Sequence, residues 1–359
     1  MVTHVRVVAV SEPPHGGPST VGPVTERSPG STGDYTLGQI GEFGLINRVA
    51  RTVRQGRAVL LGPGDDAALV STPDGRVVAS TDLLVEGRHF RRDWSTAYQV
   101  GRKAAAQNLA DIAAMGGVGS ALLVGLAAPA DLPLSWAKDL SAGLADEAEL
   151  VGASVAGGDT VRSDTLLIAV TALGDLQGRA PVTRAGAHSG DIVAYAGELG
   201  WSACGLELLL RDVDGPKQAF ARHRSPEPPY EQGPAAARAG ATAMLDISDG
   251  LLADLGHIAE ESRLVIDLDP AAFPIDDQLR ETARKLGVEV LDWVLTGGED
   301  HALAACFPPD ADLPPGWHVV GRVAEAAAED PETPEAASAP LVTVNGRPWN
   351  AAPGWDHFG

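Results

Sequence analysis

The feature that most constrains the fold of this chain is an alternation of short apolar runs with longer amphipathic runs in its first half. Apolar runs of strand length occupy Val77–Ser80, Ala121–Leu126 and Leu166–Leu173. Between them, apolar residues recur at helical spacing over Tyr98–Met115 and Ser135–Val151. Strands that alternate with helices are typical of an α/β fold, so we expect this half of the chain to be α/β.

The alternation continues after a turn near Gly178–Pro181 that is rich in Gly, Arg and Pro. There the patterns predict a strand over Ile192–Ala196, a helix through Leu206–Leu210, a short strand over Met244–Ile247 and a helix over Leu251–Glu261. A chain of 359 residues is long enough for two domains. We therefore expect an N-terminal domain over residues 35–178 and a C-terminal domain over 179–359, both of them α/β.

Two segments are expected to lie outside this alternation. Residues 11–34 are rich in Pro, Gly, Ser and Thr and lack periodic apolar positions, so we predict a disordered tail over residues 1–34. The segment Ala324–Pro340 is rich in Ala, Glu and Pro and separates the strand-like runs Trp317–Val323 and Leu341–Val344. It is expected to form a surface loop.

Charge and cysteine content limit the partners and the compartment. A formal net charge of −21 argues against broad contact with nucleic acid or anionic lipid, because both bind through clusters of Lys and Arg. An anionic substrate would therefore need a metal bridge. No apolar run is long enough to span a bilayer and no secretory signal is evident, so we expect no membrane partner. Cys204 and Cys306 have neither zinc-ligand spacing nor a disulfide framework, which favours structural thiols in the cytoplasm.

Five short motifs place acidic residues beside Gly or a hydroxyl at the expected ends of strands or helices. They are Gly64-Asp65-Asp66, Ser80-Thr81-Asp82, Asn108-Leu109-Ala110-Asp111, Gly157-Gly158-Asp159-Thr160 and Asp246-Ile247-Ser248-Asp249-Gly250. Taken singly, each is more often a solvated turn or a helix N-cap. Asp82 and Asp246, however, fall in apolar strand segments, where an unpaired carboxylate is costly, so a positive partner is expected beside them.

One of these motifs extends into a polar stripe. Gln107, Asn108 and Asp111 lie three and four residues apart on a helix that is otherwise rich in Ala. A solvated outer face explains this stripe as well as a functional site does. Oxygen ligands from several elements suit Mg²⁺, which accepts one or two carboxylates together with phosphate oxygens. Gly157 and Gly158 could let backbone N–H groups approach a phosphate, and Ser248 is expected at a helix N-terminus.

The common nucleotide and hydrolase signatures are missing from the sequence. It contains no Walker A loop, no complete dinucleotide fingerprint and no protein-kinase catalytic loop. It also contains no HExxH zinc motif and no Gly-x-Ser-x-Gly elbow. A metalloprotease or a serine hydrolase is therefore not indicated.

Taken in order, the motifs resemble those of the thiamine-monophosphate kinases, a family of the aminoimidazole-ribonucleotide-synthetase-like superfamily. The resemblance covers Gly38–Phe358. Besides the five acidic motifs it includes Gly41-Glu42-Phe43, Glu86-Gly87-Arg88-His89-Phe90, Gly297-Gly298-Glu299-Asp300 and Gly354-Trp355-Asp356-His357-Phe358. It implies a two-domain fold whose N-terminal sheet pairs with a second copy in a homodimer. It also implies ATP-dependent phosphorylation of thiamine monophosphate to thiamine diphosphate. Because the acceptor phosphate is already ionised near neutral pH, we expect direct transfer with no covalent enzyme nucleophile.

The resemblance further implies roles for single residues. It assigns several Mg²⁺ ions to Asp65, Ser80, Thr81, Asp82, Asp111, Asp159, Asp246 and Asp249. It assigns ATP contacts to Gly158, Arg184 and Ser248, and thiamine phosphate contacts to His89, Glu299 and Trp355. Considered alone, His89 suits a packed or surface histidine, Trp355 a core residue and Glu299 a turn. A requirement for K⁺ stays open.

The sequence departs from the family pattern at one element, and two other kinds of protein remain as alternative interpretations. The family commonly carries a Pro-x-Pro-Arg element where this chain has Pro226-Glu227-Pro228-Pro229. Other ATP-using members of the superfamily are the closest rivals, although two of them depend on a reactive cysteine or selenocysteine near one terminus, which this chain lacks. A non-catalytic binding protein of the same fold would be expected to lose the acidic residues, and all of them are present.

Overall fold

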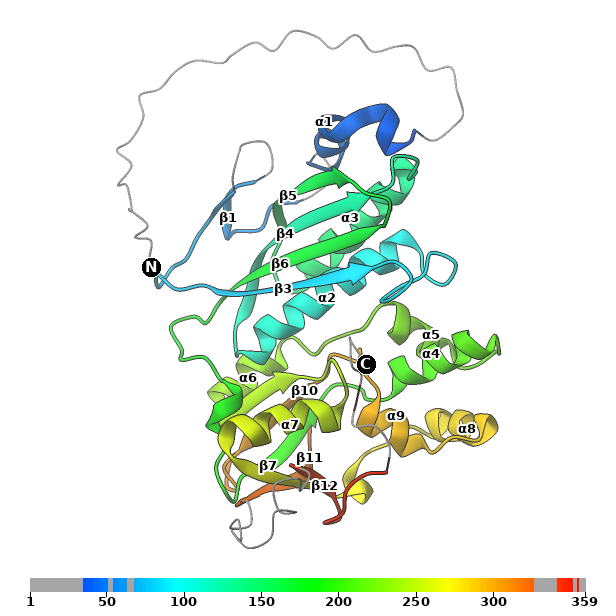
Figure 1. Ribbon diagram of the computed structural model, residues 1–359. Coiled ribbons are helices and arrows are strands. Elements are labelled where there is room, and N and C mark those ends of the chain that lie inside the picture. The colour runs from blue at the N-terminus through cyan, green and yellow to red at the C-terminus, as the bar shows by residue number, and fades with distance from the viewer. Residues whose placement is uncertain (1–34, 51–53, 63–67, 326–340, 351–353, 355–359) are drawn as a thin grey trace, which may run out of the picture. The chain divides into compact units, whose positions relative to one another are not determined.

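The computed structural model describes residues 35–50, 54–62, 68–325, 341–350 and 354. The predicted tail and nearly all of the predicted loop 324–340 lie outside the described residues, as do Asp65 and Trp355. The described elements form two large β-sheets whose sequences are separated by residues 176–191 (Figure 1). Both belong to one compact unit that begins at Asp34, and the division into two domains stays a prediction.

The first large sheet has four strands in the order β3-β6-β4-β5. The strands span Val78–Val85 (β3), Val118–Ala128 (β4), Val155–Arg162 (β5) and Leu167–Asp175 (β6). Strand β6 pairs antiparallel with β3 and β4, whereas β4 and β5 are parallel. Because parallel neighbours need a crossover connection, helix α3 (Leu134–Glu149) links β4 to β5.

Helix α2 (Ala97–Ala114) packs beside α3 on one face of this sheet (Figure 1). A capping box fixes its first turn, because Thr96 Oγ1 accepts from the Gln99 N–H and the Gln99 side chain accepts from the Thr96 N–H. The helices approach closely at two glycines. A Cβ at Gly101 would lie 2.1 Å from the carbonyl oxygen of Leu140, and one at Gly143 would lie 2.0 Å from that of Tyr98.

The opposite face of the four-stranded sheet carries exposed apolar side chains. Residues Leu83, Leu123 and Val161 are 49%, 37% and 52% exposed. They share that face because side chains alternate along a strand and paired residues of neighbouring strands point the same way. A ribbon of β1 (Val59–Leu61) and β2 (Leu69–Val70) packs near one end of the sheet. Helix α1 (Leu37–Ala50) contacts α3.

The second large sheet has six strands in the order β12-β9-β11-β7-β10-β8. They span Ile192–Ala196 (β7), Ala243–Asp246 (β8), Leu264–Leu268 (β9), Leu303–Phe307 (β10), Trp317–Glu325 (β11) and Val342–Val344 (β12). All neighbours are antiparallel except β9 and β12. This half is therefore closer to an α+β arrangement than to a parallel α/β sheet.

Helices cover both faces of the second sheet. One face packs against α4 (Trp201–Arg211), α7 (Leu251–Ser262), α8 (Asp277–Leu286) and α9 (Val290–Thr296). The other face packs against α6 (Gln232–Arg238) and against the C-terminal end of α2 through Ala113 and Ala114. Helix α5 (Lys217–Arg224) lies against α4. Helix α2 thus contributes to the cores of both halves.

The mixed α/β fold class is confirmed, and each strand and helix predicted within the described ranges is present. Strand β7 has the predicted bounds, Ile192–Ala196, whereas most of the others have shifted ends. Two motifs, however, were wrongly placed at element ends. Ser80-Thr81-Asp82 lies in the middle of β3, and Gly157–Thr160 lies inside β5, a strand that the sequence patterns did not predict. Within the described ranges, no helix combines the length and the apolar character that crossing a bilayer requires.

Candidate active site

The polar stripe of helix α2 lies against strand β3. Ser80 Oγ donates a hydrogen bond of 2.6 Å to Asp111 Oδ2, and the Asp82 N–H donates one of 3.0 Å to Asn108 Oδ1. Asn108 is fully buried and Gln107 is 9% exposed. The alternative that this stripe forms a solvated outer face is therefore wrong, since the side chains are turned toward the sheet.

The second half adds a third carboxylate, Asp246, which ends strand β8 and is 6% exposed. Burial first, and then the charge of Asp246, raise the pKa of Asp111 to about 7. Burial also raises the pKa of Asp82, and Asp246 adds to that rise. Three carboxylates, from strand β3, helix α2 and strand β8, therefore lie close enough to repel one another.

A histidine offsets part of this negative charge. His301 Nδ1 lies 3.0 Å from Asp246 Oδ2. Burial alone would lower the pKa of His301, but the hydrogen bond to Asp246 and the nearby carboxylates raise it above its ordinary value. The side chain that the structure places beside Asp246 is thus this histidine, which the sequence motifs did not reveal although it follows Glu299 by two residues.

The donor set suits a hard divalent cation. Its members are carboxylate and hydroxyl oxygens, and an added cation would relieve their repulsion. In the described part of the chain, no three His, Cys, Asp or Glu side chains already surround a metal position. Oxygens from a substrate or from water would have to complete such a site, as is usual for Mg²⁺.

Two loops hold Asp246 and His301 together through their backbones. The N–H of Ile247 donates to Ala302 O at 2.7 Å, and the N–H of Glu299 donates to Ser248 O at 2.8 Å. Both Glu299 and His301 have positive φ angles, 63° and 53°. Such angles are uncommon for residues other than glycine and often occur at functional sites. The loop of residues 297–302 therefore has an unusual backbone conformation.

Ser248 directly precedes the N-cap region of helix α7, whose start agrees with the predicted one. Helix α7 begins at Leu251 and its N-cap is Gly250. The N–H groups of Asp249 and Gly250 each donate to Asp254 Oδ2 at 3.0 Å. Asp254 thus engages the N–H groups of the two residues that precede helix α7.

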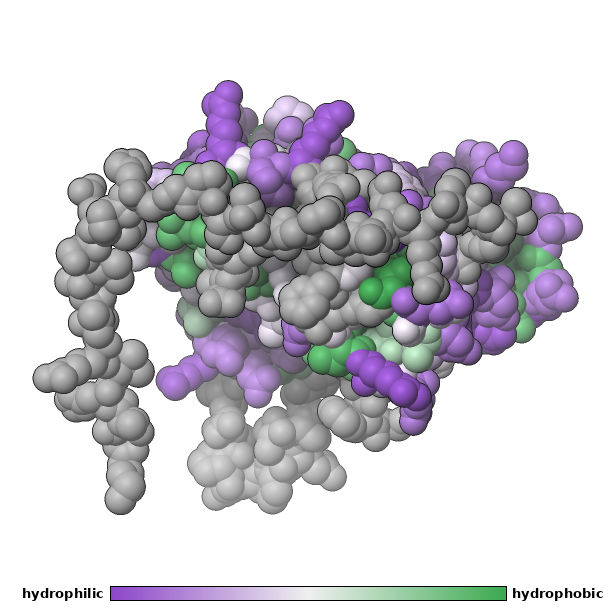
Figure 2. Space-filling view, turned by 90° about the horizontal axis from the view of Figure 1, so that it is seen from above, coloured by the Kyte–Doolittle hydropathy of each residue, from purple (hydrophilic) through white to green (hydrophobic). Residues whose placement is uncertain are grey.

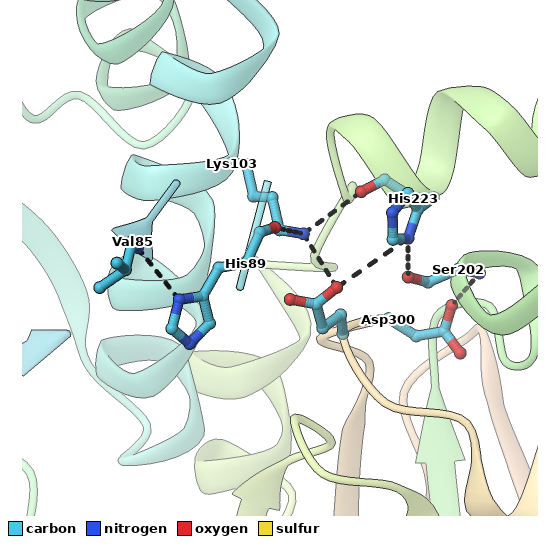
Figure 3. A network of polar contacts seen from close by, with 7 residues as sticks. Val85, His89, Lys103, Ser202, His223 and Asp300 are labelled. Carbon is cyan, nitrogen blue, oxygen red and sulfur yellow. Dashed lines mark hydrogen bonds and ion pairs between the residues drawn. The ribbon is translucent and has the colours of Figure 1, made fainter. Parts of the chain in front are cut away.

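A second polar group lies next to this cluster and centres on Lys103 (Figure 3). Lys103 is 2% exposed, and its Nζ donates to Glu299 Oε2 at 2.9 Å, to His89 O at 3.0 Å and to His223 O at 3.4 Å. Sequence reasoning missed Lys103. It lies four residues before Gln107 and eight before Asp111, so continuing the helical stripe backwards would have found it.

The charges in the second group balance. Burial would raise the pKa of Glu299, but Lys103 and then His223 outweigh this and lower it below its ordinary value. Burial first, and then the charge of Lys103, lower the pKa of His223 to about 4. Near neutral pH the group therefore consists of an ammonium, a carboxylate and a neutral imidazole.

His89 lies in the turn after β3 with a defined orientation. Its Nδ1 accepts a hydrogen bond of 3.0 Å from the Val85 N–H (Figure 3). Because a backbone N–H can only donate, Nδ1 carries no proton and the neutral ring bears its proton on Nε2. The remaining ring N–H therefore lies on the side away from Val85.

Three of the predicted side chains are not brought to the carboxylate cluster. Thr81 lies on the opposite face of β3, where its hydroxyl donates to Val170 O at 3.0 Å. Asp159 is exposed on β5, the edge strand farthest from β3, and its Oδ1 accepts from the Thr160 N–H. Arg184 is exposed in a short helical turn beside the start of β8, whereas Asp246 ends that strand.

Gly158 has a structural explanation within its own sheet. A Cβ at this position would lie 1.9 Å from the carbonyl oxygen of Val124 on the neighbouring strand β4. The glycine is thus required for strand packing whether or not it contacts a nucleotide.

The fold and these motifs match known proteins. Residues 64–176 match the family described as AIR synthase related protein, N-terminal domain, which defines the class of the first half. The thiamine-monophosphate kinase of Mycobacterium tuberculosis is 50% identical over 330 residues, which are 92% of this chain and 95% of that protein. That of Corynebacterium glutamicum is 38% identical over 90% of this chain and 95% of that protein. The chain belongs to the thiamine-monophosphate kinase family.

Solved structures agree with this relationship. AaThiL complexed with AMPPCP and TMP is 31% identical, with a TM-score of 0.71 over 90% of this chain and 98% of that chain. The thiamine-monophosphate kinase of Stenotrophomonas maltophilia K279a is 30% identical, with a TM-score of 0.70 over 84% of this chain and 96% of that chain. The hydrogenase maturation protein HypE in complex with ATP is 17% identical with a TM-score of 0.60, a likeness of fold alone.

Proposed function

We propose that this chain is a kinase that transfers the γ-phosphoryl group of ATP to thiamine monophosphate, giving ADP and thiamine diphosphate. Membership of the thiamine-monophosphate kinase family supports this activity. The observation that carries it is the meeting of Asp82 and Asp111 with Asp246 across the two sheets. An acidic cluster of this kind can accommodate two phosphate-bearing substrates only together with divalent cations.

The residues that would hold Mg²⁺ are the acidic and hydroxyl side chains that the family resemblance implies. The clustered members are Asp82, Asp111 and Asp246, with Ser80 bonded to Asp111. The remaining candidates are Asp65, Thr81, Asp159 and Asp249. When bound, the ions would neutralise phosphate charge and align the attacking and leaving oxygens.

The chain's own residues would bind and orient the substrates. His89 would donate from Nε2 to the phosphate of thiamine monophosphate, since its other ring nitrogen is engaged by Val85. Glu299 and Trp355 would contact the thiamine end, while Gly158, Arg184 and Ser248 would contact ATP. The acceptor phosphate has a second pKa of about 6 and is largely ionised near neutral pH, so no strong general base is required.

Direct transfer is further supported by the inert state of the thiols. Burial raises the pKa of both Cys204 and Cys306 to about 12, so neither provides a thiolate near neutral pH. Both are buried and free, which also fits the proposed location in the cytoplasm.

We also propose that the enzyme is a homodimer that pairs through the outer face of the four-stranded sheet. Support comes from the exposed side chains of Leu83, Leu123 and Val161 on that face. Seen from the top of Figure 1, the molecule shows hydrophobic patches between hydrophilic side chains (Figure 2). Burial of such a face is a common basis for symmetric association.

The test is a product assay with purified protein. Chromatography should detect equal amounts of ADP and thiamine diphosphate when ATP, thiamine monophosphate and Mg²⁺ are supplied, and chelation of the metal should stop both. A protein that binds ATP and thiamine monophosphate in calorimetry, yet forms neither product, would instead be a non-catalytic binding protein of this family.

A further inference from the structure

Lys103 occupies an unusual position for a lysine. It lies near the middle of α2, is 2% exposed and has core residues on both sides of it along the helix, such as Val100 and Ala104. Burying an ammonium group is costly unless it is fully hydrogen-bonded. Its three hydrogen-bond acceptors match the three N–H donors of an ammonium group.

These three acceptors come from both halves of the chain. The carbonyl of His89 follows strand β3 of the first sheet, whereas the carboxylate of Glu299 precedes β10 of the second. The carbonyl of His223 belongs to helix α5. The ring nitrogen Nδ1 of this histidine lies 3.9 Å from Glu299 Oε2, the oxygen that also accepts from Lys103. One buried ammonium group therefore fixes the turn that carries His89 relative to the side chain of Glu299.

We infer that Lys103 is a positioning residue for thiamine monophosphate, holding the phosphate contact His89 and the thiamine contact Glu299 at a fixed separation. This inference rests on the proposed function. The ion pair also means that Glu299 offers the substrate no unpaired negative charge. Its carboxylate would act as an oriented hydrogen-bond acceptor for the thiamine end and not as a counter-ion.

A purely structural role makes a different prediction. The two halves also meet at Tyr230, whose hydroxyl donates to Glu147 Oε1 at 2.6 Å, while Arg102 donates to the other oxygen at 2.5 Å. This second contact joins the halves without touching His89 or Glu299. If Lys103 only joined the halves, then loss of either contact should affect both substrates alike.

The experiment compares the steady-state kinetics of Lys103→Met, Glu299→Gln, the double variant and Tyr230→Phe, with each substrate varied in turn. Methionine keeps most of the length of the lysine side chain but lacks the charged amino group. We expect Lys103→Met to raise KM for thiamine monophosphate about 10-fold or more, while KM for ATP changes by less than about twofold. Tyr230→Phe should change neither KM by more than about twofold.

The double variant tests whether Lys103 acts through Glu299. Once Lys103 is absent, Glu299→Gln should add little to KM for thiamine monophosphate, because the carboxylate is no longer held in place. The inference is overturned if the two KM values rise together, if neither rises, or if the two substitutions have independent effects. Lys103→Arg, which keeps the charge, should recover part of the lost affinity.

Two further measurements distinguish failure of this inference from misfolding of Lys103→Met and from failure of the proposed function. If Lys103→Met does not fold, the double variant, which has no unpaired carboxylate, should fold and still bind thiamine monophosphate weakly; tight binding by it would contradict the inference. If the unaltered protein forms no thiamine diphosphate, the proposed function fails. Calorimetry with thiamine monophosphate alone still decides whether Lys103 governs its binding.

Discussion

Ser80 on strand β3 donates a hydrogen bond of 2.6 Å to a carboxylate oxygen of Asp111 on helix α2. This bond joins a sheet residue to a helix residue and holds Asp111 on the side of the strand that also carries Asp82. The first half of the chain thus supplies two carboxylates as one unit. Asp246 reaches them only where the second sheet packs against the end of α2, so the site depends on the packing of both halves.

The first prediction concerns Asp82→Asn. The amide keeps the volume of the side chain but removes one of three mutually repelling charges, so the melting temperature should be unchanged or higher. Turnover should fall on the order of 100-fold or more, because a carboxylate proposed to hold Mg²⁺ is lost. Thermal unfolding and kcat at saturating Mg²⁺ check both parts. Near-normal kcat would remove Asp82 from the site.

The second prediction concerns the acceptor. Unphosphorylated thiamine should be a poor substrate, because it lacks both the phosphate oxygen that attacks ATP and the group that His89 is proposed to contact. Product formation from thiamine and from thiamine monophosphate is compared at equal concentrations. Efficient conversion of thiamine by the pure enzyme would point to a different kinase class.

The third prediction concerns stability in acid. Burial lowers the pKa of His223 from 6.5 to about 4, so the unfolded chain binds this proton more readily than the native protein does. Stability contributed by the neutral ring is therefore full above about pH 6.5 and is lost as pH falls toward 4. In His223→Phe, unfolding near pH 5 should take up about one proton fewer than in the unaltered protein.

The matched control for this measurement is His257→Phe, since His257 lies exposed on helix α7. The proton uptake on unfolding of the two variants is then compared at the same pH. If melting temperature changed with pH at the same slope in the unaltered protein and in His223→Phe, His223 would bind protons equally in the folded and the unfolded state. That result would contradict the prediction.

The fourth prediction concerns the path of the phosphoryl group. Incubation with γ-labelled ATP in the absence of acceptor, followed by rapid denaturation, should leave no label on the chain. The buried thiols Cys204 and Cys306 stay protonated, and the acceptor is already anionic, so a covalent relay has no role. A stoichiometric label that thiamine monophosphate discharges at the turnover rate would contradict direct transfer.

Local patterns in the sequence predicted the helix that carries the polar stripe and the strand that ends at Asp246. Helical spacing relates Gln107 to Asp111 directly, and a short apolar run precedes Asp246. Whether the stripe faces solvent or the core could not be decided locally. That depends on strand β3, which contacts α2 through the Ser80 hydroxyl and the Asp82 N–H, 31 and 26 residues before their partners in the chain.

The parts that were missed depend on contacts between distant segments. Strand β5 contains Gly157 and Gly158, which weaken the strand signal, and only its pairing with β4 makes it a strand. From the local sequence, Lys103 is expected to be a solvated surface charge. Its burial follows from the contact with Glu299, which lies far away in the sequence. The left-handed backbone of Glu299 and His301 likewise has no local signal, since neither residue is a glycine.

Transfer of the terminal phosphoryl group of ATP to thiamine monophosphate is the activity proposed for this chain. The most direct measurement is a single-turnover reaction with γ-labelled ATP, thiamine monophosphate and Mg²⁺, in which the label is followed by chromatography. The label should pass from ATP to thiamine diphosphate at one rate, with unlabelled ADP formed in step, and Asp246→Asn should slow both. Label recovered as inorganic phosphate or remaining in ATP, with no labelled thiamine diphosphate, would contradict the account.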